Sequence, residues 1–129
     1  MPTEVVRGKR VLVVDDEPLI AGLLSDVLRA DGHEVDMVHN GRAALAKIAE
    51  RAYDLIVSDL RMPDLDGPGL YHELKVHKKE LTERIVFVTG NAMEPRNEEF
   101  LRSTGVPWVS KPFTVGDIHS LTQRVLRRG

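Results

Sequence analysis

Short apolar runs alternate with longer amphipathic segments along the chain, and this alternation is what most constrains its fold. Residues 11–14 form a continuous, largely β-branched run, which is typical of a strand buried on both faces. Between residues 20 and 28 the apolar side chains recur at the spacing of one helix face, and Gly32 predicts where that helix stops. The same alternation continues along the chain. Further strands are expected at residues 35–38, 55–58, 85–88 and 108–110.

The helices expected between and after these strands differ in how clearly they begin, and the last one has the clearest start. Thr114 and Asp117 have the spacing of a capping box, while Phe113 and Ile118 stand where a hydrophobic staple would pack. Asn40 predicts the cap of the second helix. Weaker helical patterns cover residues 68–77 and 94–103.

Regular alternation of strands and helices predicts parallel strands joined by right-handed crossovers, with helices on both faces of one sheet. We therefore expect an α/β fold with a single doubly wound (βα)5 parallel sheet in the order 2-1-3-4-5, the flavodoxin-like arrangement. A chain of 129 residues has room for one domain. We expect this domain to cover residues 9–129, after an N-terminal extension of residues 1–8.

Polar residues stand where the strands end, and in a parallel sheet these carboxyl ends share one edge. Asp15 and Asp16 follow the first strand, Asp59 follows the third, Thr89 ends the fourth and Lys111 follows the fifth. Two carboxylates about 4 Å apart repel by roughly 4 kcal/mol at an effective dielectric of about 20, so a cluster of three needs protons or a cation. Mg²⁺, or Mn²⁺ in its place, accepts carboxylates together with waters and phosphoryl oxygens.

Lys111 and Thr89 complete a set of groups suited to phosphoryl transfer. An ammonium supplies a second positive charge, and a hydroxyl can donate a hydrogen bond to a phosphoryl oxygen. One carboxylate would then act as the nucleophile. The residues alone leave open which aspartate attacks, and Asp59 is favoured because the adjacent pair Asp15 and Asp16 suits metal ligation.

Four segments in order carry a resemblance to a known family. They are V-L-V-V-D-D-E at residues 11–17, D-L-R-M-P-D-L-D-G at 59–67, V-T-G at 88–90 and K-P-F at 111–113. With these segments the chain resembles the receiver domains of two-component response regulators over residues 9–127. The stretch F-L-x-x-T-G-x-P at residues 100–107 is most similar to receivers attached to hybrid sensor kinases.

The resemblance implies where the phosphoryl group and the metal bind. Asp59 would be the phosphoacceptor, and Asp15 and Asp16 would hold Mg²⁺ together with it. The backbone carbonyl of Arg61 would complete the protein ligands of the ion.

The resemblance also implies which residues sense the phosphoryl group. Thr89, Gly90 and Lys111 would bind it or switch when it arrives, and the peptide bond before Pro112 would be cis. Trp108 occupies the position of a switch aromatic, where members of the family usually carry Tyr or Phe.

The implied function is a phosphorelay receiver and not an enzyme acting on other substrates, since it catalyses only its own phosphorylation and dephosphorylation. The implied donor is a sensor histidine kinase or a histidine phosphotransfer protein. The face formed by the fourth helix, the fifth strand and the fifth helix would signal to a downstream protein that the sequence does not identify.

Charge and hydropathy argue against two other kinds of partner. The net charge is −2 with mixed signs, and Arg124, Arg127 and Arg128 are interpreted as cations that end a helix, so no direct contact with nucleic acid is expected. The longest apolar runs have four residues, so neither a membrane contact nor a signal peptide is expected. The chain contains no cysteine, which is compatible with the expected location in the cytoplasm.

Three other functions are compatible with a doubly wound parallel sheet. A phosphorylation-independent interaction module would share the fold and is separated from a receiver only by experiment. A phosphatase of the haloacid-dehalogenase type expects D-x-D-x-T after its first strand, where this chain has D-D-E-P-L. A flavodoxin-like electron carrier would need a phosphate-binding loop after the first strand, and here that loop is acidic.

Three further polar residues are given structural interpretations. Asp64 and Asp66 are interpreted as turn formers in the loop after the third strand. His39 is interpreted as a surface residue, because its strand would lie at the edge of the sheet, away from the crevice.

Overall fold

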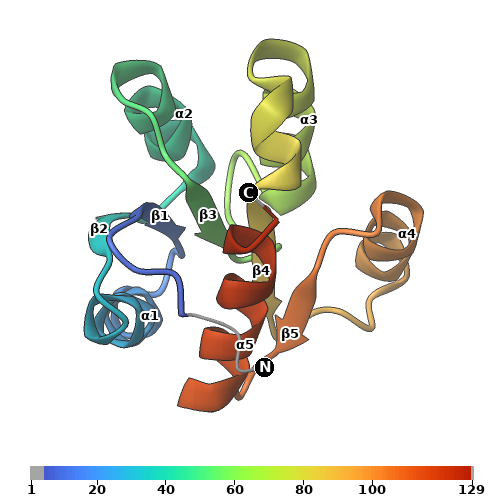
Figure 1. Cartoon of the computed structure of the whole chain (residues 1–129). Coiled ribbons are helices and arrows are strands. Elements are labelled where there is room, and N and C mark those ends of the chain that lie inside the picture. The colour runs from blue at the N-terminus through green and yellow to red at the C-terminus, as the bar shows by residue number, and fades with distance from the viewer. Residues whose placement is uncertain (1–4, 129) are drawn as a thin grey trace.

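A computed structural model describes residues 5–128, which form one parallel sheet covered by helices on both faces (Figure 1). The five strands lie in the order β2-β1-β3-β4-β5, and every neighbouring pair is parallel. This order confirms the fold that the sequence predicts. The strands are β1 (Arg10–Val14), β2 (Glu34–Val38), β3 (Leu55–Ser58), β4 (Ile85–Thr89) and β5 (Trp108–Ser110).

Burial along the strands explains the apolar runs of the sequence. All residues of β3 and β4 are buried, as are four of the five residues of β1, because these three strands lie in the centre of the sheet between two layers of helices. The edge strands β2 and β5 expose part of their residues and are correspondingly more polar.

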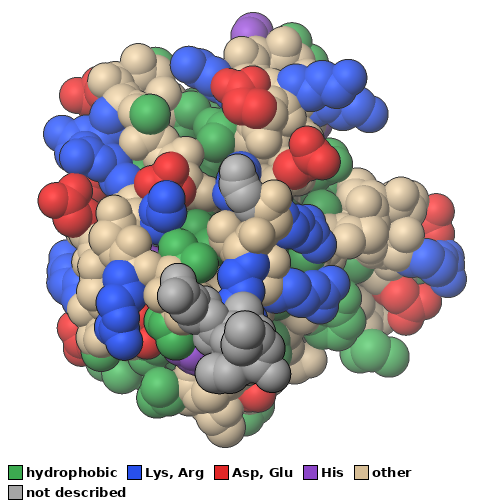
Figure 2. Space-filling model, in the orientation of Figure 1, with side chains coloured by type: hydrophobic (Ala, Val, Ile, Leu, Met, Phe, Trp, Pro, Cys, Tyr) green, Lys and Arg blue, Asp and Glu red, His purple; other side chains and the backbone are tan. Residues whose placement is uncertain are grey.

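The helices divide into two layers, each with its own apolar core. Residues of α1 and α5 pack on one face of the sheet, and those of α2, α3 and α4 pack on the other. Figure 1 shows α4 standing apart from the other helices beside the β5 edge, and in the space-filling view this part projects from the rest of the protein (Figure 2). The helices are α1 (Pro18–Ala30), α2 (Gly41–Glu50), α3 (Gly67–His77), α4 (Pro95–Thr104) and α5 (Val115–Leu126).

Local signals in the sequence set the helix starts. Asn40 caps α2, and Thr114 and Asp117 form the expected capping box at the start of α5. Asp66 caps α3 by accepting a hydrogen bond from the Gly69 N–H, and Asp64 adopts a positive φ of 69°. Both aspartates therefore shape the loop, as their interpretation as turn formers requires.

A short 3₁₀ helix, Lys79–Glu83, joins α3 to β4 and was not predicted. Its sequence is almost entirely polar, and Leu81 is its single buried residue, so it carries no periodic apolar pattern.

The segment before β1 packs against α5. The buried amide of Gln123 accepts a hydrogen bond from the Val6 N–H at 2.7 Å and donates one to the Val6 carbonyl at 2.8 Å. Residues 1–4 of the expected extension, and Gly129, lie outside the described residues. Within residues 5–128, every helix is too short or too polar to cross a lipid bilayer.

Candidate functional site

Carboxylates gather where β1 and β3 end. Ligand oxygens of Asp15, Asp16, Glu17 and Asp59 all lie within 4.8 Å of one another. The sheet places two of these residues directly, because the Asp15 N–H donates to the carbonyl of Val38 and the Asp59 N–H donates to that of Val14. Asp15 and Asp59 are buried, whereas Asp16 and Glu17 are exposed at the rim.

Lys111 supplies the cation of this cluster. Its Nζ lies 3.1 Å from Asp15 Oδ2, 3.0 Å from Asp59 Oδ2 and 3.5 Å from Glu17 Oε1. Burial by itself would lower the pKa of Lys111, but the hydrogen bonds and charges of Asp59 and Asp15 outweigh it and raise the pKa above its usual value. Lys111 therefore stays protonated at neutral pH.

Burial raises the pKa of Asp15, although the Glu17 N–H and Lys111 both favour its charged form. One ammonium among four carboxylates leaves the cluster with excess negative charge, so a further cation would be stabilised there. The oxygen donors and their spacing fit a hard divalent ion such as Mg²⁺.

The carboxylate of Asp59 is oriented by backbone donors on one side and by Lys111 on the other. Its Oδ1 accepts hydrogen bonds from the N–H of Leu60 at 2.7 Å and of Arg61 at 3.4 Å, and its Oδ2 faces Lys111. Gly67 lets the following loop pass close to this residue, since a Cβ there would lie 2.8 Å from the Asp59 carbonyl oxygen. Asp59 lines a cavity of about 630 Å³ together with Asp16, Glu17 and Arg61.

The remaining predicted residues belong to β4, to β5 or to the positions that directly follow these strands. Thr89 is fully buried at the end of β4, and its Oγ1 accepts a hydrogen bond from the Asn91 N–H at 3.0 Å. Gly90 is exposed beside Lys111, and the Lys111–Pro112 bond is cis. Trp108 is the first residue of β5, is 40% exposed and lies in a hollow that it shares with residues of α4.

The structure thus brings Asp15, Asp16, Asp59 and Lys111 together, and it adds residues that the sequence reasoning missed. Glu17 joins the acidic cluster, and its position directly after the aspartate pair was the available signal. His39 is exposed, as expected, but its ring Nδ1 lies 3.0 Å from the Asp15 carbonyl oxygen. Its strand β2 lies at the edge of the sheet, as the sequence predicts.

Comparisons with known proteins agree with this geometry. The family model for the response regulator receiver domain matches residues 11–123. The regulatory protein AtoC of Escherichia coli is 32% identical over 118 residues, which cover 92% of this chain and 25% of AtoC. The sensor histidine kinase RcsC of Salmonella typhimurium is 34% identical over 105 residues, 81% of this chain and 11% of RcsC. The chain spans from about a quarter to a half of the first curated relatives it matches.

Solved structures match over almost their whole length. The chemotaxis response regulator CheY4 of Vibrio cholerae superposes with a TM-score of 0.80 at 29% identity, covering 92% of this chain and 98% of CheY4. The receiver domain of the sensor histidine kinase PA1611 of Pseudomonas aeruginosa has a TM-score of 0.82 at 28% identity, covering 93% of this chain and 98% of that domain. That structure holds a magnesium ion coordinated in its active-site cleft.

Proposed function

The chain belongs to the response regulator receiver domain family, and on that premise we propose that Asp59 accepts a phosphoryl group in a Mg²⁺-dependent reaction. The observation that carries this proposal is the position of the Asp59 carboxylate, which lies at an open cavity within hydrogen-bonding distance of Lys111 and beside three further carboxylates. Receiver domains are signalling modules, and we propose that this one catalyses only its own phosphorylation and dephosphorylation.

Transfer would form a bond between a carboxylate oxygen of Asp59 and phosphorus. The bond from phosphorus to the imidazole nitrogen of a phosphohistidine donor would break, and that nitrogen would keep the electron pair and take up a proton. The ammonium group of Lys111 would pair with the phosphoryl oxygens after transfer, because its Nζ already lies 3.0 Å from Asp59 Oδ2. Thr89 and the backbone at Gly90 would contact those oxygens from the end of β4.

Asp15, Asp16, Asp59 and the backbone carbonyl of Arg61 would hold Mg²⁺. When bound, the ion supplies charge neutralisation and a fixed position for the phosphoryl oxygens. The acidic cluster supports this assignment, as does the magnesium ion in the related receiver domain of PA1611.

We propose a sensor histidine kinase or a histidine phosphotransfer protein as the donor, since relatives of this chain include sensor histidine kinases such as RcsC. The output would pass through the face of α4, β5 and α5 to a protein target. We assign the receiver unit to residues 9–129 and its place of action to the cytoplasm, where such donors present their phosphohistidine.

Intact mass spectrometry after incubation with acetyl phosphate and Mg²⁺ tests the proposal. We expect the addition of one phosphoryl group, which Asp59→Asn and removal of Mg²⁺ should abolish. Asp64→Asn is the matched control, because Asp64 is an exposed aspartate of the same loop and should leave phosphorylation intact. Continuous release of phosphate from a phosphomonoester would instead indicate a phosphatase. No addition, when a known receiver is labelled in parallel, would leave a phosphorylation-independent interaction module.

A further inference from the structure

A second cavity adjoins the acidic one and separates the β3–α3 loop from the start of α4. It measures about 500 Å³, and Arg61 lines both cavities. Two ion pairs cross it: Arg61 Nη1 lies 3.8 Å from Glu94 Oε1, and Arg96 Nη2 lies 4.0 Å from Asp66 Oδ2. Arg61 therefore borders both cavities, and its guanidinium lies next to Glu94 at the start of α4.

Asn97 connects the same residues from inside the protein. It is buried in the first turn of α4, and its Nδ2 donates to the Asn91 carbonyl at 2.9 Å and to Glu94 Oε2 at 3.3 Å. The Asn91 N–H in turn donates to Thr89 Oγ1. A continuous set of polar contacts thus leads from Thr89 through Asn91, Asn97 and Glu94 to Arg61.

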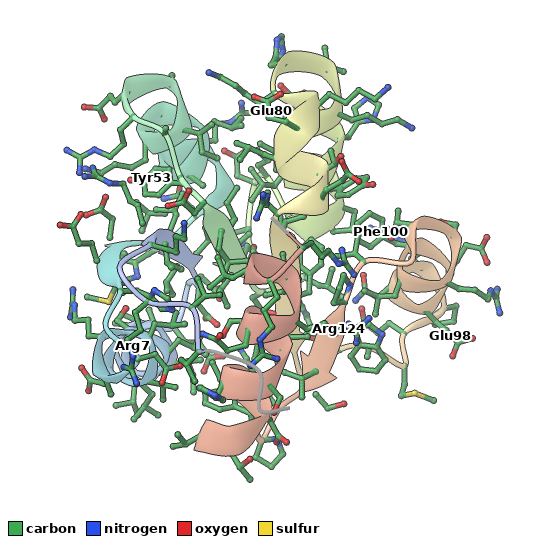
Figure 3. All side chains as sticks on the ribbon, in the orientation of Figure 1. Arg7, Tyr53, Glu80, Glu98, Phe100 and Arg124 are labelled. Atoms are coloured by element: carbon green, nitrogen blue, oxygen red, sulfur yellow. The ribbon has the colours of Figure 1, made fainter. Side chains whose placement is uncertain are left out.

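The two ends of α4 are held in different ways. Toward its C-terminal end, Leu101 is buried, and Phe100 makes edge-to-face contacts with Tyr71 and Phe87 at centroid distances of 5.4 and 5.6 Å. Figure 3 shows Phe100 on the inner side of α4.

The first turn of α4 has little beyond its polar contacts to hold it. The side chain of the N-cap residue Glu94 accepts no hydrogen bond from a backbone N–H of the helix, and Asn97 is the single buried residue of this turn. Segments with few buried apolar contacts open at low free-energy cost. The start of α4 is therefore a part of the fold that a change in local charge can release.

We propose that Arg61, Glu94 and Asn97 form a latch that holds the start of α4 in the unphosphorylated protein, and that a phosphoryl group on Asp59 opens it. The inference rests on the proposed function of Asp59. A phosphoryl group brings added negative charge and strong acceptor oxygens to the cavity that Arg61 already lines. Arg61 then leaves Glu94, whose contact at 3.8 Å between two exposed side chains is weak.

Release of the start of α4 would have two observable consequences. Backbone amides of the β4–α4 segment would exchange faster, including the Glu94 and Glu98 N–H groups that now donate to Asn91 and Glu94. The environment of Trp108 would also change, since its hollow is shared with Met93 and Leu101. Trp108 is the one tryptophan of the chain, so its fluorescence reports on this region.

Hydrogen exchange and Trp108 fluorescence, measured with and without acetyl phosphate and Mg²⁺, test the latch while intact mass records phosphorylation. In the parent protein we expect amides at 94–98 to exchange about two- to fivefold faster after phosphorylation, the range that loss of an exposed ion pair allows. Glu94→Gln should show this faster exchange before phosphorylation and little further increase after it. Glu99→Gln is the matched control, because Glu99 is an exposed glutamate of the same helix that pairs with Arg102 and is not among the residues that line the hollow of Trp108.

The outcomes separate this inference from the function on which it rests. If intact mass shows phosphorylation but the hydrogen exchange of amides at 94–98 is unchanged, the latch is refuted and the phosphoacceptor role of Asp59 is retained. Equal exchange of Glu94→Gln and the parent before phosphorylation would also overturn it, whatever the phosphorylation result. Absence of any mass increase would refute the phosphoryl trigger together with the proposed function.

Discussion

Replacing Lys111 by methionine measures how far the acidic cluster depends on the ammonium group that contacts it. Lys111 Nζ lies 3.1 Å from Asp15 and 3.0 Å from Asp59, and its side chain is only 15% exposed. At an effective dielectric of about 20, each contact contributes roughly 5 kcal/mol of attraction, against a desolvation cost of several kcal/mol per ion. Breaking a buried ion pair typically costs about 3–5 kcal/mol. Because this pair borders an open cavity, we expect a loss of about 2–3 kcal/mol in the free energy of unfolding without metal at neutral pH.

A divalent cation should offset much of that loss. The ligand oxygens of the acidic cluster lie within 4.8 Å of one another, and without the ammonium each pair repels by roughly 3 kcal/mol at an effective dielectric of about 20. An ion that binds only the folded chain stabilises it in proportion to its affinity. Mg²⁺ should therefore stabilise Lys111→Met more than it stabilises the parent protein.

Urea unfolding followed by far-UV circular dichroism, in EDTA and in saturating Mg²⁺, provides the assay. Lys75→Met is the matched control, because Lys75 is an exposed lysine on α3, far in the sequence from the site. The reasoning would be refuted if Lys111→Met were as stable as the parent in EDTA. A stability loss of the same size in Mg²⁺ would refute the part that assigns it to repulsion among the carboxylates.

Three further substitutions test other parts of the structure. Burial raises the pKa of Asp15, so the folded state loses stability as the pH rises through the range in which carboxyl groups titrate. Asp15→Asn should reduce this pH dependence and stabilise the protein at neutral pH, as measured by urea unfolding without metal. Gln123→Met should lower the free energy of unfolding by about 2 kcal/mol, because it removes two hydrogen bonds to Val6. The same substitution should have little effect in a variant that lacks the N-terminal segment through Val6. Gly67→Ala should lower the free energy of unfolding by about 1–3 kcal/mol and weaken Mg²⁺ binding measured by calorimetry, because the new Cβ would clash with the Asp59 carbonyl oxygen. Unchanged Mg²⁺ affinity would show that the loop shifts to accommodate the methyl group.

The sheet can be predicted from the sequence because each central strand is buried on both faces and therefore contains a continuous apolar run. The runs in β1, β3 and β4 are apolar without interruption, and alternation with helices then admits few strand orders. The candidate site follows from the same logic, since carboxyl ends of parallel strands meet at one edge. Asp15, Asp59 and Lys111 are far apart in the chain, yet their contacts follow from the strand order.

Contacts between side chains and distant loops or segments produce no such pattern in the sequence. Glu17 stands one residue beyond the predicted aspartates, and only the turn of the chain brings it to Lys111. The Gln123 amide pairs with the Val6 backbone across 117 positions, and a polar residue on a helix gives no indication that its amide will be buried. Neither contact follows from periodicity or strand order.

The same distinction applies to the response to a phosphoryl group that we propose. Acceptance of the group requires charges fixed at strand ends, and a rigid sheet provides them. Transmission requires an element that can leave its place, which favours weak, polar attachments over deep apolar packing. The first turn of α4 meets this requirement, because Asn97 and Glu94 hold it mainly through hydrogen bonds and one long ion pair. The residues that we propose to control the output are therefore those that sequence patterns predict least, and the hydrogen exchange of Glu94→Gln tests this proposal directly.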